Sequence, residues 1–389
     1  MKILIVLTYY RPHISGLTIY AERLANAFVK RGHEVTVLTS QFEKNLARNE
    51  NLNGVNIVRV PVWLRISKGV IMPLFGLMAT KLALENDVIQ LHLPQFDAAG
   101  VGLRGRLFKK PTIITYHCDL IMPSGTLAWL ANKAVLVMNN LAAKFAHKIV
   151  TYTKDYAENS KYLRRHLDKL EIILPPVVLP EIENSSIKSF SDENNPENMR
   201  PVIGMAVRFA TEKGVEVLLN ALPGVLKEYP NTQVQFAGPY KNIIGEEEYF
   251  SRLKPLIDNY EESGNWKFVG VLSPEEMSAF YPNLDLLVLP SLNSTEAFGL
   301  VQIEAMMNGI PCIASNLPGV RQPVKMHSMG EIIQIGNADE LSEAILKILK
   351  NPEKYKNDPE EIRSKYVPDA VAQKYEELFE LIKKDISNL

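Results

Sequence analysis

The sequence predicts an α/β fold built from two similar domains, and two observations support this prediction. Short apolar segments alternate with helical patterns along most of the 389 residues, which is typical of parallel sheets covered by helices. The alternation stops once, near residues 181–200, where the chain becomes polar and loses its periodicity, and then it starts again. We therefore expect two facing Rossmann-like domains with a central cleft, at residues 1–180 and 201–368, joined by a linker at 181–200.

The first domain opens with a strand, a helix and a second strand. An apolar run follows Met1, a helical pattern covers residues 20–29, Gly32 is expected to close that helix, and residues 34–40 form the next strand. This order predicts parallel strands. Later elements are expected as strands at 87–93, 111–117 and 147–153, a helix at 156–166 and a strand within 169–178. The GxGxxG fingerprint is absent, so neither a nicotinamide nor a flavin cofactor is expected.

Two longer apolar stretches, residues 63–84 and 127–146, also belong to the first domain. Charged residues, Pro73 and Gly76 interrupt the first stretch, which is too broken for a transmembrane helix. We interpret it as a helix packed on the sheet, and an interfacial membrane helix is the alternative. A basic cluster lies between two of the expected strands and consists of Arg104, Arg106, Lys109 and Lys110.

The second domain repeats the alternation. Strands are expected within residues 201–210, 232–238, 266–270, 285–290, 311–315 and 331–335. Ser273, Pro274 and Glu276 form a capping-box pattern that predicts the start of a helix. The last helical pattern, at residues 369–386, is expected to cross back onto the first domain.

Charge is divided unevenly along the chain, although the net charge is only −1. Residues 1–178 carry 23 Lys and Arg against 12 Asp and Glu, whereas the rest carries 20 against 32. Either the two halves attract each other, or the basic half faces an anionic membrane surface or an anionic acceptor. Nucleic acid is not an expected partner, because the basic residues are not interleaved with an aromatic platform.

Cysteine usage and the start of the chain indicate the compartment. Cys118 and Cys312 lie far apart and beside apolar strands, so we expect no disulfide and a reducing environment. The apolar run after Lys2 is too short for a signal peptide. We therefore expect a cytoplasmic protein.

Two carboxylates mark the candidate site. Glu296 follows the apolar run 286–290, so it should lie at the carboxyl end of a parallel strand, where open α/β sheets bind ligands. Glu304 falls in a helix expected to begin near Phe298. The free backbone amides at the start of that helix, at Gly299, Leu300 and Val301, would attract an anion.

Two cations follow the first strand of the second domain. Arg208 and Lys213 would suit a diphosphate, with Gly214 allowing the backbone to come close; the alternative is a solvated loop without a function. There is no pair of aspartates two residues apart and no His or Cys cluster with ligand spacing. A metal is therefore not expected.

Together these segments resemble the retaining nucleotide-sugar glycosyltransferases of the GT-B fold, family four, also called group one. The resemblance extends over nearly the whole chain. It is carried by Gly16, RGHEVTVLTS from Arg31, YHCDL around His117, Arg208 with Lys213 and Gly214, FAGP at Phe236, the FVG segment ending at Gly270, LDLLVLPS from Leu284, and EAFGLVQIE with AMMNGIPCIASNLPG after it. The chain departs from the family at Ser15, where many members have a second glycine beside Gly16.

The resemblance implies roles for individual residues. Arg208 and Lys213 would hold the donor diphosphate, Glu296 would contact the transferred sugar, and Glu304 would bind the ribose. His117 would lie near the sugar from the first domain. The implied catalytic set is therefore His117, Arg208, Lys213 and Glu296, the remaining donor-binding set is Gly16, Gly214, Gly238, Phe298, Gly299, Leu300 and Glu304, and Asp119 and Arg11 are assigned to the acceptor side.

The implied activity is transfer of a hexose from a nucleotide-diphosphate sugar with retention of anomeric configuration and without a metal or cofactor. The acceptor would be a glycolipid, a lipid-linked sugar or a polysaccharide intermediate of cell-envelope glycan biosynthesis. The enzyme would be cytoplasmic and peripheral on the inner face of the cytoplasmic membrane. A nucleotide-sugar epimerase and a non-catalytic nucleotide-sugar-binding subunit are the alternatives.

Overall fold

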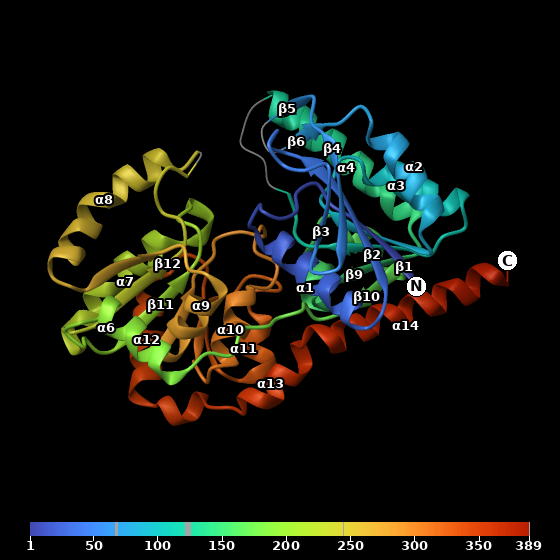
Figure 1. Cartoon of the computed structure of the whole chain (residues 1–389). Helices are drawn as coiled ribbons and strands as arrows, with labels where there is room; N and C mark the ends of the chain where they lie inside the picture. Colours follow the sequence, from blue (N-terminus) through green and yellow to red (C-terminus); the bar gives the residue numbers. More distant parts are fainter. Residues whose placement is uncertain (67–68, 121–125, 244, 389) are drawn as a thin grey trace. The chain divides into compact units, whose positions relative to one another are not determined.

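The computed structural model describes residues 1–66, 69–120, 126–243 and 245–388, and the chain forms two compact units (Figure 1). The first unit consists of Met1–Val177 and Lys365–Leu389, and the second of Val178–Ser364. Each contains one main parallel sheet with helices against it. Two parallel α/β units are the architecture that the sequence predicted.

The sheet of the first unit has the strand order β10-β9-β8-β7-β1-β2-β4-β3. Its central strands are buried along their whole length, as expected when helices cover both faces. All neighbours are parallel except β3 and β4. The parallel strands are β1 (Lys2–Val6), β2 (Glu34–Gln41), β4 (Val55–Pro61), β7 (Val88–Leu93), β8 (Thr112–Tyr116), β9 (Lys148–Thr151) and β10 (Leu170–Ile172).

Two hairpins were not predicted. Strand β3 (Asn49–Leu52) pairs antiparallel with β4 across Asn53 and Gly54, which both have positive φ, 54° and 85°. An Asn-Gly pair between two strands is the usual signal for such a turn, and it is present in the sequence. The second hairpin joins β5 (Leu64–Ile66) to β6 (Gly69–Ile71). The helix expected over residues 63–84 therefore starts later, and residues 67 and 68 of that stretch lie outside the described residues.

Right-handed crossovers divide the helices of the first unit between the two faces of its sheet, because the strand order runs in opposite directions from β1. Helix α1 covers one face and contacts the C-terminal helix α14. On the other face α2 contacts α3, and α3 contacts α4. These helices are α1 (Gly16–Lys30), α2 (Phe75–Glu85), α3 (Ala98–Leu107), α4 (Thr126–Phe145) and α14 (Pro368–Ser387), and the short α5 spans Lys154–Asn159.

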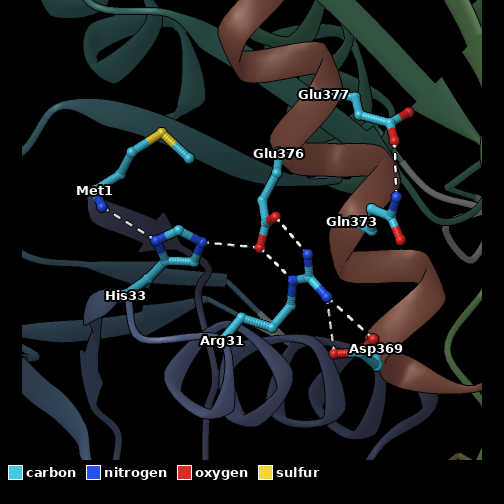
Figure 2. Close-up of polar contacts among 7 residues, drawn as sticks. All are labelled: Met1, Arg31, His33, Asp369, Gln373, Glu376 and Glu377. Carbon is cyan, nitrogen blue, oxygen red and sulfur yellow. Dashed lines mark hydrogen bonds and ion pairs between the residues drawn. The ribbon is translucent and has the colours of Figure 1, made fainter.

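Buried hydroxyl groups and a surface ion-pair network hold α14 on α1. The Tyr375 hydroxyl lies 2.8 Å from the hydroxyls of both Tyr20 and Thr115. At the rim, Arg31 donates to both carboxylate oxygens of Glu376 at 2.6 and 2.8 Å and also to Asp369 (Figure 2). His33 contacts the same Glu376 at 2.8 Å. The helix predicted to return to the first unit does so.

The second unit has a six-stranded parallel sheet with the order β13-β12-β11-β14-β15-β16. Its core combines aliphatic side chains with an aromatic group in which Phe209 and Trp266 both contact Phe236. The strands are β11 (Val202–Ala206), β12 (Gln233–Ala237), β13 (Trp266–Gly270), β14 (Leu286–Leu289), β15 (Cys312–Ser315) and β16 (Gly330–Ile333). The helices are α6 (Asn184–Asn194), α7 (Val215–Glu228), α8 (Glu247–Glu262), α9 (Pro274–Phe280), α10 (Leu300–Met306), α11 (Gln322–His327), α12 (Ala338–Lys350) and α13 (Pro359–Tyr366).

Residues 181–200, which were expected to form a linker, contain helix α6 and belong to the second unit. The helix is polar except for the partly buried Ile187 and for Phe190, which is buried and packs edge-on against Phe280 at 6.2 Å. Two apolar side chains three positions apart are too few for a clear apolar period, which is why the pattern gave no helix signal. The capping box at Ser273 and Glu276 is confirmed by both of its hydrogen bonds, 2.7 and 3.2 Å.

We predict that Glu376→Gln destabilises the first unit by about 1–3 kcal/mol, because Arg31 loses its charged partner in a part-buried site. Burial alone would raise the pKa of Glu376, but Arg31 and His33 outweigh it and lower the pKa. The stabilisation that Glu376 contributes is therefore fully present above the pKa of an ordinary carboxyl group. It is lost as the pH falls through the lowered pKa of Glu376 in the folded protein. Urea unfolding followed by circular dichroism at pH 7 and below pH 4 measures both effects.

The matched control is Glu377→Gln on the same helix. Glu377 is exposed and accepts one hydrogen bond, from Gln373 at 3.1 Å (Figure 2). This change should cost less than about 0.5 kcal/mol. Equal effects of the two substitutions at pH 7 would show that the Glu376 network does not stabilise the docked helix.

Candidate functional site

The candidate site of the second unit lies where strands β11 and β14 end. These strands are parallel neighbours, with Ile203 opposite Leu286, so the loops that follow them meet at the same edge of the sheet. The backbone amide of Leu292 donates to the carbonyl oxygen of Glu212 at 2.8 Å and joins the two loops. The loop segments 207–214 and 290–299 are therefore joined at this edge of the sheet.

Gly214 permits the close approach of these two loops. Its φ is +72°, in the left-handed region that favours glycine, and it precedes the first residue of α7. A Cβ at this position would lie 2.1 Å from the carbonyl oxygen of Pro290, which is closer than any side chain tolerates. The close approach seen at Gly214 is therefore to the loop after β14, and its predicted approach to a diphosphate stays a prediction.

Lys213 and Glu296 form an ion pair across the two loops. Lys213 Nζ lies 2.7 Å from Glu296 Oε2, and the two side chains are 19% and 20% exposed. Burial alone would lower the pKa of Lys213, but the Glu296 carboxylate outweighs burial and raises it. The lysine is therefore cationic at neutral pH, and the structure brings two of the predicted catalytic residues into direct contact.

Arg208 lies on the same loop and pairs with a residue that the sequence analysis did not identify. Its guanidinium donates to Glu212 Oε1 at 2.5 Å, four positions along the chain. Burial would raise the pKa of Glu212, but a backbone amide and Arg208 outweigh it and lower the pKa. Gly238 supports this loop from β12: its φ is +133°, and a Cβ there would lie 2.1 Å from the Val207 carbonyl oxygen.

Helix α10 begins at Leu300, two residues later than expected. Gly299 has φ +79° and precedes the helix, since its left-handed backbone cannot belong to a right-handed helix. A Cβ on Gly299 would lie 2.4 Å from Leu289 Cδ2, so this glycine also packs tightly. Phe298 is buried, with 1% of its surface exposed, and anchors the loop in the core.

Glu304 lies inside α10 and is 8% exposed. Its Oε2 accepts a hydrogen bond of 2.8 Å from the hydroxyl of Tyr281, in the turn before β14. Tyr281 was not predicted as a site residue, because it precedes Glu304 by 23 positions and only the fold brings them together. The side-chain amide of Asn308 donates to the Glu304 carbonyl and fixes the end of the short helix.

In the first unit, His117 is buried and both of its ring nitrogens are engaged. Its Nε2 lies 2.8 Å from His92 Nδ1, and its Nδ1 lies 2.5 Å from the Tyr152 hydroxyl. Burial lowers the pKa of His117 well below the usual range, and His92 adds to this effect, so the imidazole is neutral at pH 7. Its partners His92 and Tyr152 were missed because β7 and β9 carry no motif around them.

The other predicted residues of the first unit make contacts within that unit. Asp119 accepts hydrogen bonds from the Tyr116 and Ser160 hydroxyls at 2.8 and 2.6 Å. Arg11 forms an ion pair with Glu22 at 2.5 Å. Gly16 is the first residue of α1, whose cap is Ser15. Ser15 therefore occupies the position of the second family glycine as a helix cap.

Two further features of the described part of the chain bear on ligands and membranes. No three His, Cys, Asp or Glu side chains of the described residues are arranged to hold a metal ion. Among the helices described, none combines the length and the apolar character that a membrane crossing requires.

Comparison with known families identifies both halves of the chain. The family model described as Glycosyltransferase Family 4 matches residues 14–179, and the model described as Glycosyl transferases group 1 matches residues 186–365. Together they take in nearly the whole sequence. The solved structures share the fold over the full length: sucrose-phosphate synthase from Thermosynechococcus elongatus covers 98% of each chain with a TM-score of 0.75 at 20% identity, and Anabaena HepE in complex with UDP-glucose covers 100% of each with a TM-score of 0.69 at 18% identity.

Curated relatives are similar over most of the chain. An uncharacterized glycosyltransferase of Methanocaldococcus jannaschii is 25% identical over 90% of both proteins. The alpha-monoglucosyldiacylglycerol synthase of Streptococcus pneumoniae is 23% identical over 90% of this chain and 78% of its own length. The phosphatidyl-myo-inositol mannosyltransferase of Mycolicibacterium smegmatis is 23% identical over 90% and 85%.

We predict that Gly214→Ala destabilises the second unit more than Gly309→Ala. The two glycines have nearly the same φ, +72° and +76°, but nothing lies within 4 Å of a Cβ on Gly309. Gly309→Ala should cost about 1 kcal/mol through backbone strain alone. Gly214→Ala should cost a further 1–3 kcal/mol, roughly, because the Pro290 carbonyl must move. Thermal unfolding of both variants measures the difference, and equal costs would show that the close approach of the loops is not required.

Proposed function

We propose that this chain, which belongs to family four of the retaining GT-B glycosyltransferases, moves a hexose from a nucleoside diphosphate sugar to a hydroxyl group of a lipid acceptor. The observation that carries the proposal is the Lys213–Glu296 ion pair at the joined ends of β11 and β14. It places a permanent cation and a carboxylate 2.7 Å apart, beside the guanidinium of Arg208 on the same loop. A phosphate group and a sugar hydroxyl require these two kinds of partner side by side.

Phosphate binding follows from the charges of the loop after β11. Lys213 is paired with the carboxylate of Glu296, and Arg208 is paired with that of Glu212. We propose that the donor diphosphate takes the place of these carboxylates, because its greater negative charge makes it the stronger partner for two cations. Glu296 is then released to accept hydrogen bonds from the hydroxyls of the sugar. Donor binding would therefore place the two cations at the diphosphate and the carboxylate of Glu296 at the sugar, on either side of the bond that breaks.

The reaction breaks the bond between the anomeric carbon and the diphosphate oxygen and forms one between that carbon and the acceptor oxygen on the same face. Negative charge grows on the leaving diphosphate, and preorganised cations at that position contribute most to lowering the barrier. Lys213 and Arg208 supply them, and the proton of the acceptor hydroxyl leaves with the diphosphate. Glu296 would stabilise the positive character that develops on the sugar ring.

Glu304 is proposed to bind the ribose of the donor. The Tyr281 hydroxyl donates to its Oε2, and that bond orients the carboxylate of Glu304 within α10. His117 is proposed to act on the sugar from the first unit. Since both of its ring nitrogens are engaged with His92 and Tyr152, it must release one of them before it can contact a sugar hydroxyl.

The acceptor class is inferred from the relatives. The names of two of them specify a diacylglycerol glycolipid and a phosphatidylinositol as the molecules they modify or make. We propose an acceptor of the same chemistry, a membrane lipid with a free hydroxyl on its headgroup. The enzyme would accordingly work at the inner face of the cytoplasmic membrane in cell-envelope glycan synthesis, attracted there by the basic first unit.

Removing either member of the ion pair should abolish transfer. Lys213→Ala and Glu296→Gln should each lower kcat by about 10²–10³, since each removes a charge aimed at the reacting groups. The assay uses a panel of labelled uridine and guanosine diphosphate hexoses with diacylglycerol and phosphatidylinositol acceptors in detergent. Lys241→Ala, an exposed lysine of the same unit, is the control.

Three outcomes would contradict this assignment. Full activity of either variant would remove the ion pair from the mechanism. An epimerised donor formed without an acceptor would indicate an epimerase. Tight calorimetric binding of donors without turnover on any acceptor would indicate a binding subunit.

Tyr281→Phe separates orientation of Glu304 from catalysis. The change removes the hydrogen bond to Glu304 Oε2 and keeps the ring in the core. We expect donor KM to rise about fivefold, because one hydrogen bond to a charged group contributes about 1 kcal/mol or more, while kcat stays close to that of the wild type. Steady-state kinetics at saturating acceptor measures the split. A fall in kcat with unchanged KM would place Glu304 at the reacting centre.

A further inference from the structure

Helices α2, α3 and α4 form a layer that covers one face of the first unit's sheet (Figure 1). Arg104 of α3 fastens α2 to this layer by donating to the Thr80 hydroxyl at 2.7 Å and to the Gly76 carbonyl at 3.0 Å. On its other side, α3 packs on α4 at Gly102, where a Cβ would lie 3.3 Å from that of Phe145. The three helices therefore present their outer sides next to one another.

Each helix of this layer exposes large apolar side chains on its outer side. In α2, Phe75, Ala79 and Leu82 are buried against the unit, whereas Leu77 is 73% exposed. In α3, Leu107 is 67% exposed. The exposed large apolar residues of the layer are Leu74, Leu77 and Leu84 at α2, Leu103 and Leu107 of α3, and Val137 and Leu141 of α4. They repeat at helical spacing and form one apolar stripe per helix.

The charges between these stripes are almost all positive. Along α2, α3 and α4 the only acidic residue is Glu85, which lies 3.9 Å from Lys81. The exposed cations on these helices and on the turn after α3 are Lys81, Arg106, Lys109, Lys133 and Lys144. Lys110, in the same turn, reaches the carbonyl of Leu84 at 3.5 Å and connects the ends of α2 and α3.

The opposite face of the same sheet has a different surface. Among its described residues, α1 exposes no large apolar side chain and α14 exposes one, Leu381. Helix α14 also carries five acidic residues, Asp369, Glu376, Glu377, Glu380 and Asp385. Helices α1 and α14 therefore present fewer exposed large apolar side chains than the layer of α2, α3 and α4.

We propose that the outer face of α2, α3 and α4 docks on an anionic lipid bilayer. Apolar patches of this extent are rarely left open to water in soluble proteins. Leucine stripes flanked by Lys and Arg fit the boundary between acyl chains and anionic headgroups, where both parts are satisfied together. A second copy of the chain fits poorly, because a two-fold contact would place the cations of one face against those of the other.

This inference rests on the proposed function for the source of the bilayer, the membrane that holds the lipid acceptor. It adds which face of the first unit meets that membrane. Arg104 is used inside the layer, so Arg106 and Lys109 are the exposed members of the basic cluster that belong to this surface. Exposed apolar side chains of α2, α3 and α4 belong to it together with the cations.

The test is flotation of the full chain with vesicles, without donor or acceptor. We expect binding to vesicles of phosphatidylglycerol mixed with phosphatidylcholine, weaker binding as salt is raised, and little binding to phosphatidylcholine alone. Arg106→Gln with Lys109→Gln should lower the partition coefficient about 25-fold, at about fivefold for each cation. Leu77→Glu with Leu107→Glu should lower it at least tenfold, roughly, by placing carboxylates against the headgroups.

Leu381→Glu on α14 is the control, an exposed leucine from the other face, and it should leave flotation unchanged. Circular dichroism and calorimetric binding of nucleoside diphosphates show that each variant is folded and that its second unit is intact. If the Leu77→Glu and Leu107→Glu variant unfolds, flotation of the Arg106→Gln and Lys109→Gln variant still tests the proposal. Nucleotide binding without flotation would overturn the docking surface alone, whereas flotation without any transfer would overturn the proposed activity alone.

Three other results would also overturn the proposal. The first is equal binding of the protein to neutral and anionic vesicles. The second is a loss of vesicle binding with Leu381→Glu as large as with Leu77→Glu and Leu107→Glu. The third is a protein that binds no vesicles but sediments as a dimer, which the Leu77→Glu and Leu107→Glu variant dissociates.

Discussion

The ion pair between Lys213 and Glu296 connects two loops that the chain places 83 positions apart. It exists because β11 and β14 are parallel neighbours, so their carboxyl ends and the loops after them must share one edge of the sheet. A lysine buried to this degree would lose affinity for its proton, and Glu296 prevents that. The ion pair therefore keeps Lys213 cationic at the edge of the sheet where the two loops meet.

Sequence reasoning placed the loops that carry these residues at strand ends because the relevant constraints are local, and the roles assigned to the residues stay predictions. A short apolar run followed by a polar loop places Glu296 and Lys213 at strand ends, and the glycine at 214 indicates a close backbone approach. The partners were less accessible. Glu212 is four positions from Arg208, a spacing that offered a signal, but nothing near Tyr281 marks it as the partner of Glu304, and only the packing of the turn before β14 on α10 brings them together.

The same division holds for the fold. Strands buried on both faces are continuous apolar runs, and each was expected close to where it lies. The hairpin at Asn53 and Gly54 and the polar helix α6 were missed, the first despite a turn signal and the second because it has only two apolar residues, Ile187 and Phe190. His117 shows the remaining limit: a sequence identifies the residue but not the orientation of its ring, which here is fixed by His92 and Tyr152.

The return of the C-terminal helix to the first unit makes the second unit an insertion within the first, from Val178 to Ser364. As the chain is synthesised, all residues of the second unit emerge before Tyr375, whose hydroxyl satisfies Tyr20 and Thr115 in the interior of the first. The unit that is translated first is therefore completed last. Until then α1 keeps an uncovered apolar side, and the first unit depends on α14 to close it.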